Sequence, residues 1–474
     1  MSDSEPAWDR AQAVVARMWV VAGLFHVWNQ IPWPKEPFEP TLTRVVLELG
    51  LVLSGLLVLW RPLRVAPFLV FVLIELVHML LDFPRIANHW LLTGLMAGAW
   101  VASASRLSAR GALSPGRWLR DVVPAIRWLI LVGYGAAAIA KLNRDFLDPE
   151  VSCAATTWTN IAEQWWTFLP ASPAFLWMAI VVTVVVELAI PPLLLSRRGV
   201  MLGLLVGLWF HYSISVTPLL RVPDFASLLF VTFLLFAPLE VIARIGDYAA
   251  GLRVVVVRRW RLLTAVALGV LALALVPAWI VDGGVDLGAW FMRARLQAFA
   301  LYGLAIIGLV LLAARPPEGA TPEPVRPGGM RLGNVAHVLL VGVALLSAAQ
   351  PYLGGRTVAN LSMFSNLRTE DGRNNHLILP VFYLVEHQRE LVRVEEASIP
   401  FLHELSTRSA ALPWWELRWR AQAHPDASLT YVRDGEVHRV DRVGSDPALM
   451  APLGVGRRWL AFRGVDEGRQ SCAW

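Results

Sequence analysis

Residues 65–82 read VAPFLVFVLIELVHMLLD, a continuous apolar run that holds only three ionisable residues. An α-helix needs about 20 mostly apolar residues to cross the hydrocarbon core of a bilayer. A helix on the surface of a soluble protein is instead polar along one face. The run therefore predicts a membrane-spanning helix.

Runs of the same kind recur along the chain of 474 residues, which is 56% hydrophobic and 16% charged. Soluble domains carry about a quarter charged residues, and the mean hydropathy of +0.53 agrees with a membrane protein. We expect a mainly α-helical, polytopic transmembrane bundle of about 10–11 spans. The predicted spans are residues 12–30, 43–60, 65–82, 89–105, 124–141, 173–195, 200–217, 224–240, 261–281, 297–314 and 332–350.

The basic residues between these runs predict the orientation of the chain, because cytoplasmic loops are enriched in Lys and Arg. With a cytoplasmic N-terminus, an odd number of spans places the C-terminus outside. The formal net charge of +6 is explained by the same clusters, so we expect no nucleic-acid partner. The arginines of the inner loops then fall within residues 61–64, 106–120, 197–198, 244–259 and 315–331.

The composition changes after residue 350, where charged residues become frequent. Alternation of apolar and polar residues is typical of half-buried strands. It predicts strands at residues 391–395, 415–420 and 429–433, and a hairpin turn at Asp434–Gly435 that leads into residues 436–440. We therefore expect two domains. They are a helical domain at residues 1–350, with a Pro/Gly-rich cytoplasmic loop at 315–330, and a small β-rich extracytoplasmic domain at 351–474.

Ionisable side chains within spans are costly to bury and are functional candidates by default. Glu75 and His78 share one face of the third span. Two interpretations are open: the residues form a binding pair, or they form a structural hydrogen-bonded pair between helices. Lys141 ends the fifth span, where it is either a site residue or a side chain that reaches the interface.

Other polar residues lie in the neighbouring spans. Asn88 and His89 open the fourth span, and His211 ends an apolar helix, where packing is the ordinary explanation. Glu187 in the sixth span could pair with any neighbouring helix. These residues predict a polar site in the outer half of the membrane, and their pattern does not define its chemistry.

Five segments resemble the vitamin K-dependent γ-carboxylase family, whose membrane part is also called the HTTM domain. The sequence AAIAKLNRDF at 137–146 resembles the family's small-residue helix followed by Lys-Leu and an acidic residue. Asn88–Trp90 resembles its Asn-His motif, and Phe210–His211 its motif of a histidine after an aromatic residue. Leu361–Asn366 lies where the family's chain leaves its last span, and Asn374–His376 resembles bacterial members.

In that family, a lysine deprotonates a reduced naphthoquinone, which reacts with O2 and becomes an epoxide through a strongly basic intermediate. That base removes a proton from a Glu side chain, and CO2 adds to the carbanion. A lysine acts as a base only when neutral, and apolar surroundings favour its neutral form. No metal is required. The resemblance implies Lys141 as the base and His89 as an acid or hydrogen-bond donor, with the quinone near Asn88, His211, Glu75 and His78.

The resemblance also implies a bacterial inner membrane, with the lipid bilayer, a lipid quinone and a periplasmic protein or peptide substrate as partners. Both cysteines, Cys153 and Cys472, fall outside in the predicted topology. An oxidising periplasm permits a disulfide between them, which would fasten the tail to the membrane part as a comparable bridge does in the family. The alternative is two free thiols.

The sequence leaves three kinds of function open. The first is a membrane enzyme that oxidises a reduced naphthoquinone, with or without coupled carboxylation of Glu. The second is a non-catalytic quinone- or lipid-binding or transport protein on the same helices. The third is an interaction module, which predicts an exposed apolar patch within residues 390–465.

Overall fold

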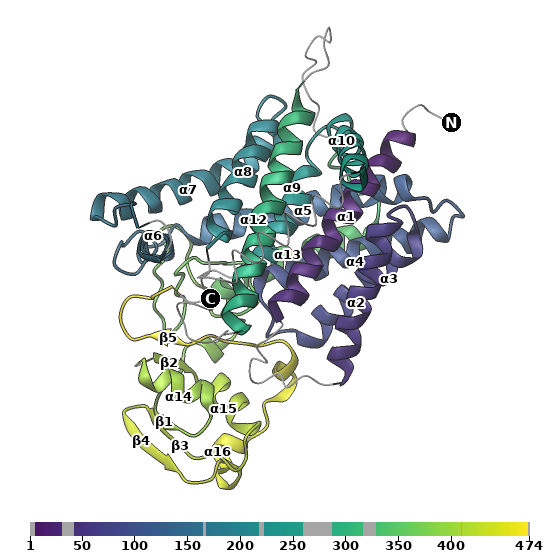
Figure 1. The fold of residues 1–474 in the computed structure, drawn as a ribbon. Helices are drawn as coiled ribbons and strands as arrows, with labels where there is room; N and C mark the ends of the chain where they lie inside the picture. Colours follow the sequence, from purple (N-terminus) through teal and green to yellow (C-terminus); the bar gives the residue numbers. More distant parts are fainter. Residues whose placement is uncertain are drawn as a thin grey trace. The chain divides into compact units, whose positions relative to one another are not determined.

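The computed structural model describes residues 5–30, 42–164, 167–217, 222–258, 287–315, 329–408 and 410–472, and these are mainly helical (Figure 1). The apolar runs form helices because a helix satisfies its own backbone hydrogen bonds within apolar surroundings. The helices before residue 350 are α1 (Glu5–Gln30), α2 (Leu42–Trp60), α3 (Val65–Asp82), α4 (Asn88–Ser108), α5 (Pro115–Ala140), α6 (Cys153–Gln164), α7 (Pro173–Leu195), α8 (Val200–Ser215), α9 (Pro223–Leu234), α10 (Leu239–Arg258), α12 (Leu287–Ala314) and α13 (Val335–Ala349).

Seven helical segments of the described chain are long and apolar enough to cross a membrane. Several carry exposed apolar side chains, such as Leu53 on α2, Val181 on α7 and Leu339 on α13. Exposed apolar surface of this extent is typical of contact with lipid or another protein. The seven segments are Glu5–Asn29, Leu42–Trp60, Val65–Asp82, Pro115–Ala140, Pro173–Leu195, Met292–Ala314 and Val335–Leu353.

The count of seven is lower than the predicted ten or eleven. Helices α8 and α9 have 16 and 12 residues, which corresponds to about 24 and 18 Å of helix against a core of about 30 Å. Helix α4 covers the predicted span 89–105, but its run is interrupted by polar residues and is not among the seven. The predicted span 261–281 lies outside the described residues.

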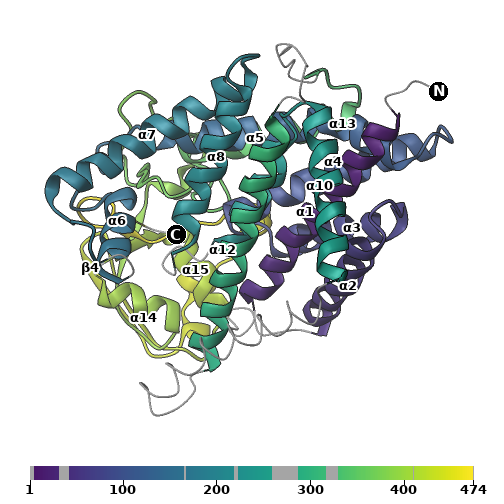
Figure 2. The ribbon, with the colours of Figure 1, turned by 45° about the horizontal axis from the view of Figure 1, so that its top comes forward.

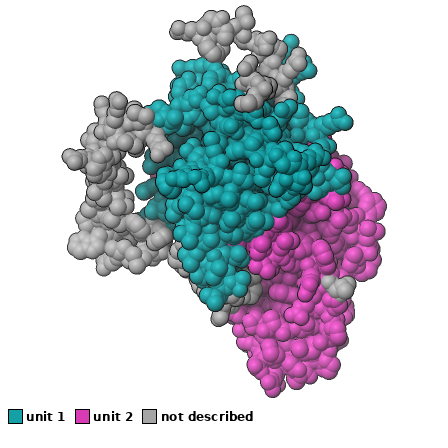
Figure 3. All heavy atoms as spheres, turned by 90° about the vertical axis from the view of Figure 1, so that its right-hand side faces the viewer, with its two compact units in different colours: residues 1–75, 97–127, 189–337 teal, residues 76–96, 128–188, 338–474 magenta. Residues whose placement is uncertain are grey.

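The chain forms two compact units, coloured separately in Figure 3. Unit 1 comprises residues 1–75, 97–127 and 189–337, and unit 2 comprises residues 76–96, 128–188 and 338–474. The residues after 350, predicted as a separate domain, thus belong to one unit with parts of α3, α4, α5, α7 and α13.

The interior of unit 1 is built on α1, which packs along α2, α9 and α10, while α12 packs along α8 and α10 (Figure 2). Large aromatic rings fill part of this interior. The ring of Trp100 lies 5.9 Å from Trp19, 5.0 Å from Phe68 and 5.1 Å from Trp118, each edge-on. Edge-to-face contacts are a favoured arrangement of aromatic rings. The indole of Trp118 also donates to the Trp100 carbonyl at 2.8 Å.

Segments predicted to share the cytoplasmic side lie together within unit 1. The N–H of Gly116 donates to Asp9 at 2.8 Å, which joins the first turn of α5 to α1. The guanidinium of Arg244 donates to the Arg315 carbonyl at 2.9 Å, which joins two further predicted inner loops. Each contact joins segments that the topology prediction places on the same side.

Segments predicted to share the outer side lie together within unit 2. Arg85, between α3 and α4, pairs with Glu416 of the C-terminal region at 2.8 Å. Its guanidinium also stacks over Trp419, 3.1 Å from the ring centroid. The predicted disulfide between Cys153 and Cys472 is confirmed. The segment between α3 and α4 and the first residue of α6 are therefore fastened to the chain that follows α13.

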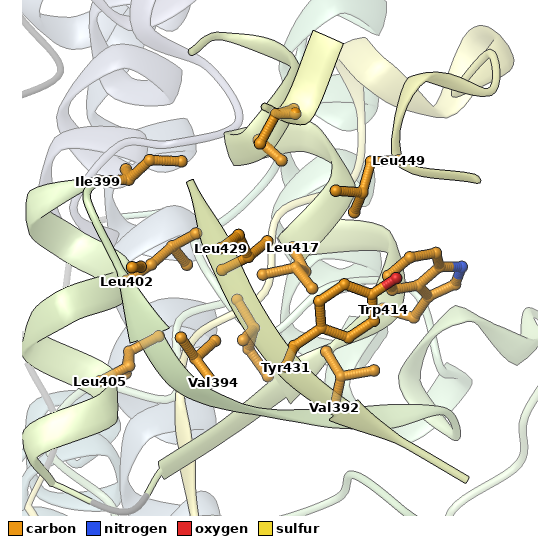
Figure 4. Close-up of a cluster of buried hydrophobic side chains, with 14 of the residues drawn as sticks. Val392, Val394, Ile399, Leu402, Leu405, Trp414, Leu417, Leu429, Tyr431 and Leu449 are labelled. Carbon is orange, nitrogen blue, oxygen red and sulfur yellow. The ribbon is translucent and has the colours of Figure 1, made fainter. Parts of the chain in front are cut away.

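The C-terminal region of unit 2 holds a small antiparallel sheet in the order β4-β3-β1-β2-β5. Buried side chains of β1, β3, α14 and α15 meet on one face of it (Figure 4). The elements after α13 are η1 (Gln350–Leu353), η2 (Glu386–Gln388), β1 (Leu391–Ala397), α14 (Pro400–Thr407), β2 (Ala410–Pro413), α15 (Trp414–Gln422), β3 (Leu429–Arg433), β4 (Glu436–Val440), η3 (Val443–Ser445), α16 (Pro447–Met450), η4 (Gly454–Arg458) and β5 (Val465–Asp466).

Three of the four predicted strand segments are confirmed as β1, β3 and β4, with Asp434–Gly435 as the turn. The prediction of a strand at 415–420 is wrong, because this segment lies in α15. Trp414, Leu417 and Ala421 are buried at spacings of three and four, which one face of a helix provides. The sequence WELRWR is compatible both with the two-residue period of a strand and with the 3.6-residue period of a helix.

Candidate functional site

Lys141 follows the last residue of α5 and is buried in unit 2, with 3% of its surface exposed. Its Nζ lies 2.8 Å from a carboxylate oxygen of Glu187 on α7, which is 7% exposed. The same Nζ donates to the carbonyls of Met363 at 3.0 Å and Ala137 at 3.4 Å. The amine therefore points into the protein and does not extend to the membrane–water interface.

Aromatic groups border this ion pair. The Phe146 ring centroid lies 5.8 Å from Lys141 Nζ, which is within the range of a cation–π contact. Tyr134, two turns earlier on α5, is buried and close enough to Glu187 to feel its charge. The buried ion pair thus has aromatic neighbours on both sides of Lys141 in the sequence, at Tyr134 and Phe146.

The loop that supplies the Met363 carbonyl has an unusual backbone. Ala359, Leu361, Phe364 and Asn366 all have positive φ, between 47° and 62°. Non-glycine residues seldom adopt this conformation, and where it is held by its surroundings it gathers at functional sites. Four such residues within eight positions therefore indicate that this loop is shaped for its role beside Lys141.

Asn88 holds this loop in place. Its side-chain oxygen accepts hydrogen bonds from the N–H groups of Asn360 at 2.7 Å and Leu361 at 2.9 Å. The prediction for Asn88 was contact with a quinone. The structure gives its oxygen a positioning role, because the residues that it fixes lead directly to Met363 and so to Lys141, and contact with a quinone stays a prediction.

A second layer of buried amides and one carboxylate supports the same loop. Asn143 accepts from the N–H of Phe146 at 2.8 Å and donates to the Ser365 carbonyl. Asn375 donates to Asp145 at 2.8 Å and to the Asn366 carbonyl at 2.8 Å. Sequence reasoning gave Asn143 no role, although the AAIAKLNRDF segment includes it.

The C-terminal tail enters this layer from the other side. The N–H of Gln470 donates to Asp145 at 2.9 Å, and the Gln470 carbonyl accepts from Asn366 at 2.9 Å. Asn366 also accepts from the N–H of Cys153 at 2.9 Å, next to the disulfide with Cys472. The disulfide therefore closes the network that surrounds the Lys141 loop.

His376 is held as a neutral imidazole. Its Nδ1 accepts from the N–H groups of Ile378 at 3.0 Å and Leu379 at 2.9 Å, so Nε2 carries the proton that is donated to the Ile139 carbonyl at 2.9 Å. Burial lowers the pKa of His376 below 6.5, and the bond to Ile139 opposes this only in part. Protonation of Nδ1 would break both backbone bonds.

This arrangement predicts a pH dependence of stability. As the pH falls below 6.5, His376 of the unfolded chain binds a proton while the folded chain does not, so the free energy of unfolding decreases. We expect His376→Asn to weaken this decrease, because an amide oxygen accepts the same bonds without titrating. Thermal midpoints of both proteins between pH 5 and 8 test this, and parallel curves would contradict it.

The remaining predicted residues lie elsewhere in the fold. His89 is half-buried in the first turn of α4, within unit 2. His78 is buried on α3 within unit 2. Glu75 belongs to unit 1, where it accepts from the Trp19 indole at 2.8 Å. This hydrogen bond joins α3 to α1.

His211 also belongs to unit 1, at the end of α8. Its ring contacts Phe210, Phe225 and Phe233, with centroids 5.2 to 6.0 Å apart. A further buried pair in this unit joins His26 to Asp224 at 3.0 Å. Asp224 received no role in the sequence analysis, since a single carboxylate at the start of a short apolar helix has no distinctive pattern.

No family model, curated protein or solved structure matches the chain.

Proposed function

We propose that the protein spans a bacterial inner membrane several times, with a cytoplasmic N-terminus and an extracytoplasmic C-terminal region. Seven apolar helices support insertion. The orientation is supported by the arginines of the predicted inner loops. It is also supported by the contacts within each unit, which join inner loops to inner loops and outer loops to outer loops. A disulfide on the outer side suits an oxidising compartment.

We further propose that unit 2 holds a site at which a reduced naphthoquinone is oxidised. The observation that carries this proposal is the buried Lys141–Glu187 pair, 2.8 Å apart on two helices. Ionisable groups buried in membrane helices are expensive and mark sites of proton transfer or binding. Of the five segments that resemble the γ-carboxylase family, those with Asn88, Lys141, Leu361–Asn366 and Asn374–His376 belong to this unit.

The pair can move protons in two steps. Transfer of a proton from the Lys141 ammonium to the Glu187 carboxylate leaves a neutral amine, and only a neutral amine accepts a proton from a hydroquinone hydroxyl. The Met363 carbonyl keeps the amine in place during the exchange. A buried setting also limits access of water to the base.

The bound hydroquinone would supply all four electrons that O2 takes up, two as hydroquinone becomes quinone and two as its C=C bond becomes the epoxide. Hydroquinone and O2 thus give the quinone epoxide and water, and one oxygen atom enters each product. Carboxylation of Glu, if coupled, replaces a C–H bond by C–CO2 and releases a proton. The fit to the ligand is supported by Phe146 and Tyr134, which offer aromatic surfaces beside the charged pair.

The test is formation of the epoxide by the purified protein in detergent, from a reduced naphthoquinone and isotopically labelled O2. We expect labelled epoxide from the wild type and from Arg393→Gln, which breaks only two exposed ion pairs, with Glu395 and Glu467, and none from Lys141→Met. A folded wild-type protein that binds the quinone and forms no epoxide would favour the binding or transport function. Labelled CO2 with Glu peptides then tests the coupled step.

A further inference from the structure

The segment at residues 377–385 reads LILPVFYLV and carries no charged side chain, although charged residues flank it on both sides. Its apolar side chains do not form a core. Leu377, Ile378, Phe382 and Leu384 are 52%, 70%, 60% and 75% exposed. An exposed apolar cluster of this kind marks contact with a membrane or a protein.

The two ends of this segment are fastened to the ends of two candidate spans. The N–H of Leu377 donates to the Leu142 carbonyl at 2.9 Å, just after α5. The N–H of Leu384 donates to the Leu353 carbonyl at 3.0 Å, at the last residue of the Val335–Leu353 span. The segment thus runs from the outer end of one predicted span to the outer end of another.

We propose that residues 377–385 form an interfacial wedge that inserts into the outer leaflet of the lipid bilayer. This inference goes beyond the redox chemistry and depends on the proposed membrane insertion. Backbone bonds to two span ends place the wedge at the level where the spans leave the hydrocarbon. At that level exposed apolar side chains enter the boundary between headgroups and acyl chains, and flanking charged residues remain in water.

The rest of the C-terminal region contrasts with the wedge. Among its described residues from 390 to 465, the exposed large apolar side chains are Val437, Met450 and Trp459, which come from three separate segments. The apolar surface expected there for a protein partner is concentrated instead at 377–385. Continuity with the span ends favours lipid as the occupant over a second protein.

The wedge also borders the candidate site. Ile139, which is 43% exposed on the last turn of α5, lies two residues before Lys141, and its carbonyl accepts the His376 bond. Leu377 follows His376 directly. A lipid-soluble ligand in the outer leaflet would therefore meet an apolar surface that leads to the Lys141 segment.

The test places an environment-sensitive fluorophore on single introduced cysteines, with the native disulfide left closed, in protein reconstituted into phosphatidylcholine vesicles. Ile378→Cys and Phe382→Cys report on the wedge. Val343→Cys, on the exposed face of α13, is the reference for a spanning helix, and Val437→Cys, on β4, is the reference for water. Quenching is measured with brominated lipids and with aqueous iodide.

We expect brominated lipid to quench positions 378 and 382 strongly, as at 343, and iodide to quench 437. Quenching of 378 and 382 by iodide alone would overturn the wedge, while protection from both quenchers would mean that a protein covers the segment. If brominated lipid also fails to quench position 343, the proposal of membrane insertion itself is wrong. The two failures are therefore distinguishable.

Discussion

Lys141→Met is expected to lower the free energy of unfolding by about 3–5 kcal/mol, because it leaves the buried Glu187 carboxylate without its partner. Glu187→Leu should have a comparable effect for the opposite reason, since it leaves a buried ammonium. Both groups are almost fully enclosed, so water cannot replace the lost partner.

The double variant Lys141→Met/Glu187→Leu should recover most of this loss. Replacing both members of a buried pair by apolar residues is often neutral or stabilising, and the two sites are in direct contact, so their effects should not add. Thermal unfolding in detergent measures all three variants. Additive losses in the double variant would show that the two residues act independently, contrary to the 2.8 Å contact.

Opening the disulfide is the second large effect that we expect. The bridge joins residues 319 positions apart, and loss of a native disulfide costs about 2–5 kcal/mol in small domains. The local consequence should be release of the tail at Gln470, whose bonds to Asp145 and Asn366 support the Lys141 loop. Reductant should therefore lower the thermal midpoint of the wild type.

The matched control is Cys153→Ala/Cys472→Ala, which should have the lowered midpoint from the start and no further response to reductant. Trypsin cleavage after Arg469, whose side chain pairs with Glu150 at 2.6 Å, should become faster in both cases. An equal response of the two proteins to reductant would show that the bridge is not what reductant acts on.

Much of the fold could be predicted because local patterns determine it. Long apolar runs gave the positions of α2, α3, α7 and α13 to within a few residues, and the Asp434–Gly435 pair gave the hairpin. Within the described residues, fewer helices qualify as spans than predicted, in part because α8 and α9 are apolar but short. Apolar character alone does not separate a spanning helix from a shorter buried one.

The candidate site could be predicted only in part. Lys141 was identified because a charge at the end of an apolar run is unusual, but its partner Glu187 lies 46 residues away, and the pairing depends on how α5 and α7 pack. The loop at 359–366 carries no glycine at its four positive-φ positions, so the sequence offered no turn signal. Tertiary bonds from Asn88 hold the first part of that loop, at Asn360 and Leu361.

The most direct test of the central claim is turnover by Lys141→Met/Glu187→Leu, measured as oxygen uptake and epoxide formed from a reduced naphthoquinone. If the pair moves protons for the reaction, this variant should unfold at nearly the wild-type temperature and yet form no epoxide. If it is as stable as the wild type and turns over at the wild-type rate, the buried pair serves only to hold α5 against α7, and the proposed chemistry at Lys141 is wrong.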